Sequence, residues 1–461
     1  MDIQKNIFRA YDIRGIVGEG ITEKNIILIG TAIGTRIRAE NSKQVIVARD
    51  GRLSGPFLHK ALLTGLLQSG CEIYDVGCVP TPLLYFATKH LQIGSAIMLT
   101  GSHNPAEYNG LKVMINNKTL YNEKILDLYN IIQNETFITG EGSLATKEIM
   151  PVYIEAIKAN ISLKKPLKIV IDCGNGVTGI IAPHLFAQLG CAVVPLYCEV
   201  DGNFPNHHPD PSKMENLRDL QTAVLAHKAD IGFAFDGDGD RVGVVDNTGK
   251  VIWADKILML LAQAVLVSNP HAEIIYDVKS SKHIEPFILA AGGKPLMWKT
   301  GHSFIKAKMQ ETGALLAGEF SGHFFIKDKW NGFDDGLYAA ARLLEILAHS
   351  DMSSNELFAT LPESMSTEEL QITVGEEEKF YIIEKLKAHA SFVNAEKILI
   401  DGLRVVWPEG WGLIRSSNTT PSIVLRFEAD NIDALQGIIY LFQEALFSID
   451  PHLKIPYFSW K

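Results

Sequence analysis

The sequence predicts an α/β protein made of three related units, followed by a smaller α+β unit, over 461 residues. Three observations support this. Strand and helix signals alternate three times along the first three quarters of the chain. The third strand of each round runs directly into an unusual polar loop. The tail lacks this alternation. A chain of this length is expected to hold roughly three or four domains.

The composition excludes several classes of protein. The chain has 43 Lys and Arg against 53 Asp and Glu, a formal charge of −10, which argues against a nucleic-acid or membrane-surface binder. Its five cysteines form no CxxC pair, so a reducing cytoplasm is expected. The N-terminal stretch is charged throughout and lacks the apolar segment of a signal peptide. The longest apolar run, 257–267, is shorter than the about 20 residues of a membrane helix.

The first unit begins with a short apolar run at 45–48, which predicts a strand. Apolar residues at helical spacing predict a helix over 57–68, and 72–76 predicts a second strand. Thr81 followed by Pro82 is typical of an N-cap and first helical position. A third strand is expected over 95–99. Strands that alternate with helices in this way favour a parallel sheet covered by helices.

The second and third units repeat this order. In the second, strands are expected at 167–171, 192–197 and 231–235, with helices at 180–189 and 214–227. In the third, a helix at 255–267 precedes strands at 273–277, 295–298 and 314–317. The repetition of the pattern indicates diverged copies of one unit.

The tail differs from these units. After Leu361 and Pro362, the pattern predicts a strand at 370–374, a helix at 379–390, three strands between 397 and 428, and a helix from Asn431. We therefore expect domains at 1–148, 149–252, 253–364 and 365–461.

Three polar loops follow the third strands: TGSHNP at 100–105, DGDGDR at 236–241 and GEFSGH at 318–323. Ligands of open α/β sheets bind at the carboxyl ends of strands. The three loops therefore suggest a single cleft between the three units.

The DGDGDR loop places carboxylates at Asp236, Asp238 and Asp240. In an extended chain, alternate side chains point to the same side, and three oxygens of this kind suit Mg²⁺. An EF-hand would need Gly and Glu where Arg241 and Asn247 stand, so that interpretation is excluded. An acidic solvated turn is the alternative, and it is less favoured because the carboxylates would repel one another.

The TGSHNP loop offers Ser102 as a nucleophile or a phosphorylated residue. His103 is adjacent and is expected to point away from Ser102, so a Ser-His-Asp triad is not indicated. A turn-capping role for Ser102 is the alternative.

Two further loops carry groups for a sugar phosphate. RSSNTTP at 415–421 offers an arginine and small polar residues that can surround a phosphate, although a plain hairpin loop is as plausible. Glu319 and Ser321 lie two residues apart, on one side of a segment expected to be extended, and can hold vicinal sugar hydroxyls. Trp330 nearby could stack on a sugar, but core packing is favoured.

A GxGxxG pattern at 174–179, with Glu199 after the next strand, fits a dinucleotide fingerprint. Such glycine turns are common without a nucleotide, and this pattern leaves the other loops unexplained. An NAD(P)-binding oxidoreductase is therefore an alternative of lower weight.

Taken together, FRAYDIRG at 8–15 and the four loops TGSHNP, DGDGDR, GEFSGH and RSSNTTP occur here in a fixed order. This combination resembles the α-D-phosphohexomutase superfamily, most closely its bacterial phosphomannomutase/phosphoglucomutase branch. The resemblance covers essentially the whole chain. It implies three mixed-sheet α/β domains and a C-terminal α+β domain around a central cleft.

The resemblance also implies roles for individual residues. Ser102 would be the phosphoserine, which binds Mg²⁺ together with Asp236, Asp238 and Asp240. Sugar hydroxyls would bind Glu319 and Ser321, and the non-reacting phosphate would bind Arg415, Ser417, Asn418 and Thr419. Other residues expected to line the cleft are Tyr11, Arg14, Lys112, Arg241, Lys279, His302 and His323.

The implied reaction moves a phosphoryl group between C1 and C6 of a mannose or glucose phosphate through a hexose 1,6-bisphosphate. Arg14, Arg241 and Lys112 would screen the charge that develops. Lys112 and His302 are both candidates for the general base. A non-catalytic sugar-phosphate binding protein is a further alternative. A cytoplasmic monomer without a nucleic-acid or membrane partner is expected.

Overall fold

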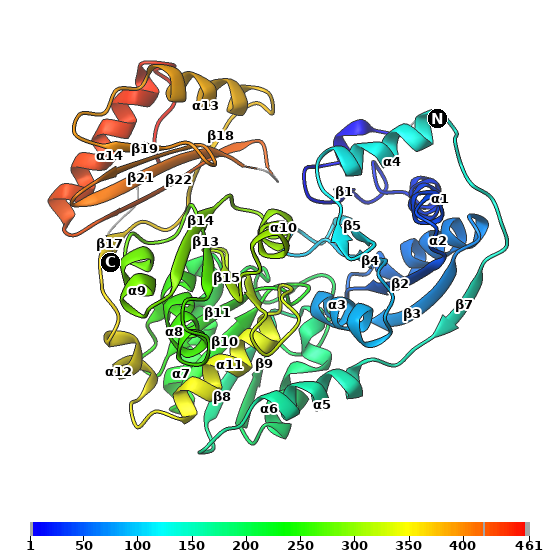
Figure 1. Ribbon diagram of the computed structural model, residues 1–461, viewed down its shortest axis with the longest axis horizontal. Helices are drawn as coiled ribbons and strands as arrows, with labels where there is room; N and C mark the ends of the chain where they lie inside the picture. The colour runs from blue at the N-terminus through cyan, green and yellow to red at the C-terminus, as the bar shows by residue number, and fades with distance from the viewer. Residues whose placement is uncertain (1–2, 418–419, 457–461) are drawn as a thin grey trace.

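The computed structural model describes residues 3–417 and 420–456, and it contains four sheets formed in order along the chain. In Figure 1 the first unit (blue to cyan) lies at one end, the second and third units (green to yellow) form the middle, and the fourth unit (orange to red) lies above the third. No helix among the described residues is long and apolar enough to cross a membrane.

The first sheet has the strand order β1-β5-β4-β2-β3-β7, and β6 pairs with β5. Its strands are β1 (Ile13–Ile16), β2 (Gln44–Arg49), β3 (Glu72–Cys78), β4 (Ala96–Leu99), β5 (Tyr108–Ile115), β6 (Lys118–Thr119) and β7 (Ser143–Thr146). Its helices are α1 (Glu23–Ala39), α2 (Gly55–Gln68), α3 (Thr81–His90) and α4 (Glu123–Gln133).

The second sheet has the order β12-β11-β10-β8-β9. Its strands are β8 (Lys168–Asp172), β9 (Ala192–Leu196), β10 (Ile231–Phe235), β11 (Val242–Asp246) and β12 (Val251–Ile252), with helices α5 (Met150–Asn160), α6 (Ala182–Gln188) and α7 (Arg218–His227). The helix expected at 180–189 is shorter, α6, and a 3-10 turn at Val177–Ile180 precedes it, since the backbone of Ile181 is not helical. The helix expected at 214–227 divides into a 3-10 turn at Met214–Leu217 and α7.

The third sheet has the order β14-β13-β15-β16. Its elements are β13 (Glu273–Asp277), β14 (Lys294–Trp298), β15 (Leu316–Gly318), β16 (Phe324–Ile326), α8 (Ala254–Ser268), α9 (Ile284–Ala290), α10 (His302–Thr312), α11 (Gly336–Ala348) and α12 (Ser354–Ala359).

These three sheets share one topology. In each, the first strand pairs in parallel with the second and the third, and a fourth strand returns antiparallel beside the third. The corresponding series are β2-β3-β4-β5, β8-β9-β10-β11 and β13-β14-β15-β16. The common order confirms that the units are related and that their sheets are mixed. Each predicted polar loop is the tight connection between the third and fourth strands.

The fourth sheet has the order β17-β22-β21-β20-β19, with β18 paired to β22. Its strands are β17 (Met365–Ser366), β18 (Leu370–Thr373), β19 (Glu396–Ile398), β20 (Leu403–Trp407), β21 (Gly410–Ser416) and β22 (Ser422–Ala429). Helices α13 (Glu378–His389) and α14 (Ile432–Phe447) pack on it. The expectation of three strands between 397 and 428 is wrong, because a two-residue hairpin turn separates β20 from β21.

The first three units share apolar cores. One cluster of buried side chains includes Met98 of the first sheet, Tyr153 of α5, Phe233 of the second sheet and Leu337 of α11. The fourth unit has its own cluster around Phe427. The three α/β units therefore hold one another in place, and this fixes the positions of their polar loops.

Candidate active site

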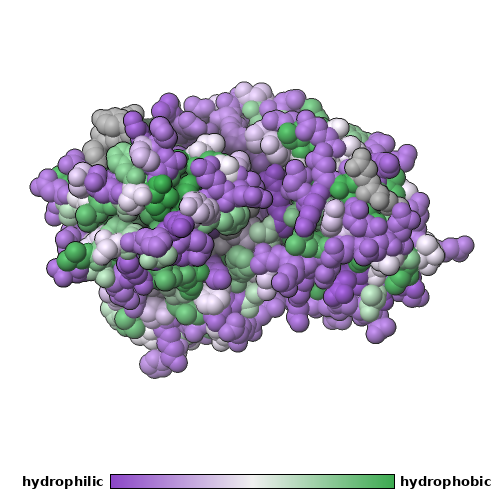
Figure 2. Space-filling model, turned by 90° about the horizontal axis from the view of Figure 1, so that it is seen from above, coloured by the Kyte–Doolittle hydropathy of each residue, from purple (hydrophilic) through white to green (hydrophobic). Residues whose placement is uncertain are grey.

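A cleft of about 560 Å³ opens where the four units meet. Figure 2 shows a hollow near the middle of the upper face, bordered mainly by hydrophilic residues. Of the predicted site residues, the following line the cleft: Tyr11, Arg14, Ser102, Lys112, Arg241, Lys279, His302, Glu319, Ser321, His323, Arg415 and Ser417. The predicted residues Asn418 and Thr419 lie outside the described part of the chain.

Ser102 is held in a strained turn directly after β4. Its backbone lies in the left-handed region, with φ of 50°. Its amide donates to the Thr100 hydroxyl at 2.7 Å, and its hydroxyl donates to Asp236 Oδ2 at 3.2 Å. Contrary to expectation, His103 does not point away, since its Nδ1 lies 3.1 Å from the Ser102 Oγ. The left-handed turn rotates the two neighbours toward the same side.

Arg52 anchors this turn, and nothing in the sequence indicated its role. Its guanidinium is buried and donates to the carbonyls of Ser102, Asn104, Pro105 and Tyr108 at 2.6–2.9 Å. Because a rigid guanidinium satisfies several carbonyls at once, Arg52 fixes the shape of the whole 100–105 loop.

The three carboxylates of the DGDGDR loop do come together. Oxygens of Asp236, Asp238 and Asp240 lie within 4.8 Å of one another, and all three residues are fully buried. The reason differs from the expected one, because residues 237–240 form a turn and not an extended segment. Gly239, with φ of 78°, donates its amide to Asp236 Oδ1 at 2.9 Å and so closes the turn.

Cations from two units surround these carboxylates. Lys112 Nζ of β5 donates to Asp238 at 2.6 Å and to Asp240 at 2.5 Å. Arg241 Nε donates to Asp236 at 3.1 Å, and its Nη1 donates to Asp210 at 3.2 Å. Nothing in the sequence indicated that Asp210 belongs to the site.

The pKa values of Asp236 and Asp240 are shifted in opposite directions. Burial, and then the nearby Asp240, raises the pKa of Asp236 to about 8. Burial also opposes ionisation of Asp240, but Lys112 and His323 outweigh it and hold that pKa well below its usual range. Asp238 Oδ1 is buried without a hydrogen-bond partner among the described residues. Oxygen donors of this kind, crowded and buried, fit a divalent cation such as Mg²⁺.

The hydroxyl of Thr81 also contacts the trio. Thr81 was expected to cap α3, but the N-cap is Pro80, and the Thr81 hydroxyl donates to Asp238 Oδ2 instead. The Thr81 amide donates to the Asp238 carbonyl at 2.8 Å. The start of α3 is therefore docked onto the acidic loop of the second unit.

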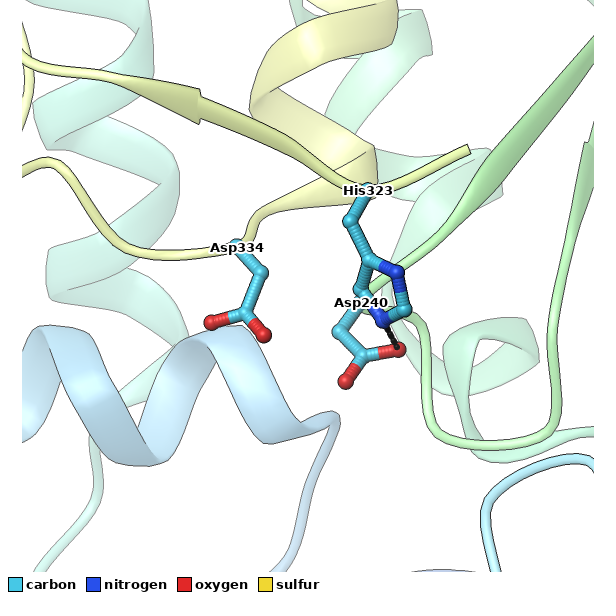
Figure 3. Close-up of side chains that lie close together, drawn as sticks. All are labelled: Asp240, His323 and Asp334. Carbon is cyan, nitrogen blue, oxygen red and sulfur yellow. Dashed lines mark ion pairs between the residues drawn. The ribbon is translucent and has the colours of Figure 1, made fainter. Parts of the chain in front are cut away.

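A second acidic group adjoins the first, as Figure 3 shows: Asp334 points toward Asp240, and His323 contacts Asp240. The His323 Nε2 lies 3.4 Å from Asp240 Oδ1, and the His302 Nδ1 lies 3.3 Å from Asp334 Oδ2. Burial, reinforced by Lys306, lowers the pKa of His302 to about 4. The pKa of His323 is raised, because Asp240 outweighs the cost of burial. Burial and the neighbouring charges therefore shift the pKa values of the two rings in opposite directions.

The GEFSGH loop faces the same cleft from the third unit. Glu319 accepts a hydrogen bond from the Gly301 amide, and burial raises its pKa. Residues 319–322 form a turn closed by the Gly322 amide on the Glu319 carbonyl at 3.0 Å, so the expected extended segment is wrong. Ser321 Oγ nevertheless lies 2.9 Å from His323 Nδ1 and lines the cleft.

The fourth unit closes the opposite side of the cleft with cations. Arg415, at the end of β21, donates from Nε to Asp401 at 3.1 Å. Lys279 of the third unit pairs with Glu369 at 2.8 Å. Both cationic side chains are buried and line the cleft. Such a pair can neutralise a phosphate group.

The glycine turn at 174–179 does not offer a nucleotide site. A side chain at Gly179 would meet the Cys198 carbonyl at 2.0 Å, and Gly176 packs against Gly237. The turn leads into a 3-10 segment and not into the long helix of a dinucleotide fold. Trp330 stacks on Tyr338, with ring centroids 4.4 Å apart, and is not part of the cleft.

Four family models match the chain in order. They describe the α/β/α domains I, II and III of phosphoglucomutase/phosphomannomutase, at residues 5–139, 151–249 and 253–365, and its C-terminal domain, at 369–439.

Similar proteins span nearly the full length. A phosphomannomutase/phosphoglucomutase of Pseudomonas aeruginosa is 53% identical over 452 residues, which cover 98% of each chain. A phosphoglucomutase of Neisseria gonorrhoeae is 50% identical over 458 residues, covering 98% of this chain and 99% of the other. A crystal structure of a phosphoglucomutase/phosphomannomutase family protein from Burkholderia thailandensis superposes with a TM-score of 0.93, at 49% identity, over 99% of this chain and 100% of that one.

Proposed function

Because the chain belongs to the phosphoglucomutase/phosphomannomutase family and is a phosphohexomutase, we propose that Ser102 transfers the phosphoryl group between C1 and C6 of mannose and glucose phosphates. The observation that carries this proposal is the position of Ser102. Its hydroxyl lies in the cleft, 3.2 Å from a carboxylate of the buried acidic trio.

In the first step a sugar hydroxyl attacks phosphorus on phospho-Ser102. The bond between phosphorus and the serine oxygen breaks, and a bond from phosphorus to the sugar oxygen forms. The sugar hydroxyl loses its proton to a base, and the serine oxygen gains a proton. The product is a hexose 1,6-bisphosphate. After this intermediate reverses its orientation, the second step returns the other phosphoryl group to Ser102, whose hydroxyl loses its proton, and the sugar oxygen that the phosphoryl group leaves gains one.

We propose His302 as the group that accepts the proton. Its pKa of about 4 leaves the ring neutral at neutral pH, and the ring lines the cleft. Lys112 was the other candidate. Although burial disfavours its charged form, Asp238 and Asp240 raise the pKa of Lys112 well above its usual value. Lys112 therefore suits charge stabilisation, together with Arg14 and Arg241.

A Mg²⁺ ion would be held by Asp236, Asp238, Asp240 and the phosphate on Ser102. When bound, it would supply positive charge to the transferred phosphoryl group and to the serine oxygen. Arg241 and Lys112, which lie against the carboxylates, keep these side chains in place from both sides.

We propose that Glu319 and Ser321 bind sugar hydroxyls and that Arg415, Lys279 and Ser417 bind the phosphate that does not react. These residues lie on the third and fourth units, whereas Ser102 lies on the first. A substrate can therefore turn end for end while the same groups hold its distal phosphate. Tyr11, whose hydroxyl donates to the Thr300 carbonyl at 3.0 Å, and His323 complete the wall.

The remaining parts of the proposal concern the whole protein. Hexose 1,6-bisphosphate would be the activator as well as the intermediate. We propose a monomer that acts in the cytoplasm, with domain boundaries after residues 148, 252 and 364. The acidic composition and the absence of CxxC pairs support this setting.

The test is a coupled mutase assay of Ser102→Ala with glucose 1-phosphate and mannose 1-phosphate, in the presence of Mg²⁺ and a trace of bisphosphate. We expect turnover to be nearly abolished and the mass of one phosphoryl group to be absent from the intact protein. Ser143→Ala, at an exposed position of β7, is the control and should keep both. Near-normal activity of Ser102→Ala would refute the nucleophile.

A further inference from the structure

A second cavity, of about 430 Å³, lies between the first and third units. One wall comes from α3, β6 and the start of α4, and the other from α10 and the loop after β16. It shares no lining residue with the cleft. Its volume is in the range of small-molecule sites in proteins.

The charged residues that line this cavity are all basic. Five of its lining residues are lysines: Lys89, Lys118, Lys124, Lys306 and Lys327. Among the described residues no Asp or Glu lines it, although the whole chain carries a formal charge of −10. Within the described part of the chain, only Lys306 of these five forms an ion pair, with Asp334 behind it. Like charges gathered in a concave site raise the local concentration of anions.

A polar group without a partner lies in the wall. Ser303 of α10 is 1% exposed, and its hydroxyl has no hydrogen-bond partner among the described residues. A buried hydroxyl without a partner costs about 1–3 kcal/mol, so it is normally satisfied. An anion in the cavity would supply the missing acceptor.

Aromatic side chains and a fixed lysine define the interior of the cavity. Lys306 Nζ lies 4.3 Å from the centroid of the Tyr85 ring and donates to Asp334 at 2.9 Å, which holds its charge at a fixed point. Tyr121 and Phe333 also line the cavity. Gln310 donates to the Asn117 carbonyl at 3.1 Å and ties the two walls together.

We propose that this cavity is a binding site for a small phosphorylated anion, separate from the substrate cleft. The four lysines without an ion pair supply the charge that a phosphate group requires, and Ser303 supplies a hydrogen-bond donor. The site does not depend on the function proposed for the cleft. It does share α10 with the cleft, because that helix begins at His302 and continues through Ser303 and Lys306.

The test is calorimetric titration with pyrophosphate in the absence of divalent cations, in an Arg415→Ala background that weakens anion binding in the cleft. The double variant K118E/K327E should bind pyrophosphate at least about tenfold more weakly than this background. The control K24E/K60E changes the net charge equally at exposed positions of α1 and α2, and it should bind as the background does. Equal weakening by both variants, or no heat in the background protein, would overturn the proposal.

Hydrogen exchange locates the bound anion. Pyrophosphate should slow amide exchange in peptides that cover 117–124, 303–310 and 327–333. Protection confined to the cleft loops at 100–105 and 236–241 would contradict the site. Ser303→Ala separates a role in anion binding from a role in stability. It should raise the melting temperature of the free protein, because an unpaired buried hydroxyl is removed, and reduce the affinity for pyrophosphate several-fold.

Discussion

At the scale of single residues, the position of the Ser102 side chain depends on an unusual conformation of its backbone. Ser102 projects into the cleft from a left-handed turn, which costs roughly 1–3 kcal/mol and persists only under external support. That support comes from Arg52 and Asp50. Asp50 accepts from the Thr100 hydroxyl at 2.7 Å and pairs with Arg52 at 3.2 Å. The proposed nucleophile is therefore positioned before any substrate arrives.

His302 is expected to stay unprotonated down to a lower pH than a free imidazole. Its pKa is about 4 in the folded protein, below the about 6.5 of a free imidazole. The unfolded chain therefore takes up the proton first as the pH falls. The stability that depends on neutral His302 is complete above about pH 6.5 and is lost as the pH falls toward 4, up to about 3 kcal/mol.

The measurement is NMR of protein labelled at the histidine Cε1 carbon. The His302 signal, assigned by its loss in His302→Gln, should keep its position between about pH 8 and about pH 5.5, whereas it titrates normally in the urea-unfolded chain. A midpoint near 6.5 in the folded protein would show that burial and Lys306 do not lower the pKa of His302.

At the scale of elements, the acidic loop at 236–241 after β10 is in close contact with the serine loop at 100–105 after β4. A side-chain carbon at Gly237 would lie 2.3 Å from the Ser102 carbonyl. The Thr81 amide, at the start of α3, reaches the carbonyl of Asp238. Only glycine allows the two strand ends to approach so closely, and this contact sets the distance between the nucleophile and the carboxylates.

Gly237→Ala should therefore push the two loops apart. We expect a loss of about 1–3 kcal/mol in unfolding free energy from the clash, and a drop in kcat of about tenfold or more as the loops separate. Thermal unfolding and the coupled assay measure the two effects. Gly437→Ala, on α14 with open space around it, is the control and should retain activity with equal or higher stability. A Gly237→Ala enzyme with unchanged kcat would show that the close approach is dispensable.

At the scale of the whole molecule, the fourth unit is seated on the third through two buried arginines. Arg404 Nη1 donates to the carbonyls of Val278 and Ser280, at 2.6 and 2.8 Å, and its guanidinium stacks 3.8 Å from the Trp411 ring centroid. Arg426 donates to the Lys279 carbonyl and stacks 3.6 Å from the Phe320 ring centroid. The side of the cleft proposed to bind phosphate is thereby joined to the segment that carries Lys279.

Arg404→Met tests this seat. The substitution leaves two buried carbonyls without donors, at about 1–3 kcal/mol each, and frees the segment that holds Lys279. We expect KM for glucose 1-phosphate to rise more than kcat falls, together with a lower melting temperature. Arg218→Met, at an exposed position of α7, should change neither. A normal KM for Arg404→Met would mean that the seat does not position Lys279.

The sequence predicted much of this protein from local patterns. Apolar periodicity located the parallel strands and most of the helices between them, because burial of one face repeats along the chain whatever its partner is. The order of the polar loops indicated the family and a shared cleft. In the fourth unit the pattern gave three strands between 397 and 428 where the structure has four, since the two-residue turn between β20 and β21 interrupts the apolar run too briefly to be seen.

The site itself was only partly visible in the sequence. Ser102, the acidic trio and Arg415 stand in loops whose composition is conspicuous. Arg52 and Asp334 do not, because an isolated charged residue looks the same whether it lies on the surface or is buried in the site.

The sequence by itself thus determined the fold class, the family and the groups available for chemistry, since these depend on residue type and spacing. Only the tertiary structure decided that His103 turns toward Ser102, that the pKa of His302 is lowered while that of His323 is raised, and that lysines from two units line a second cavity. Proton affinities and local fields depend on burial and on the distances between groups far apart in the chain, and only folding sets those distances.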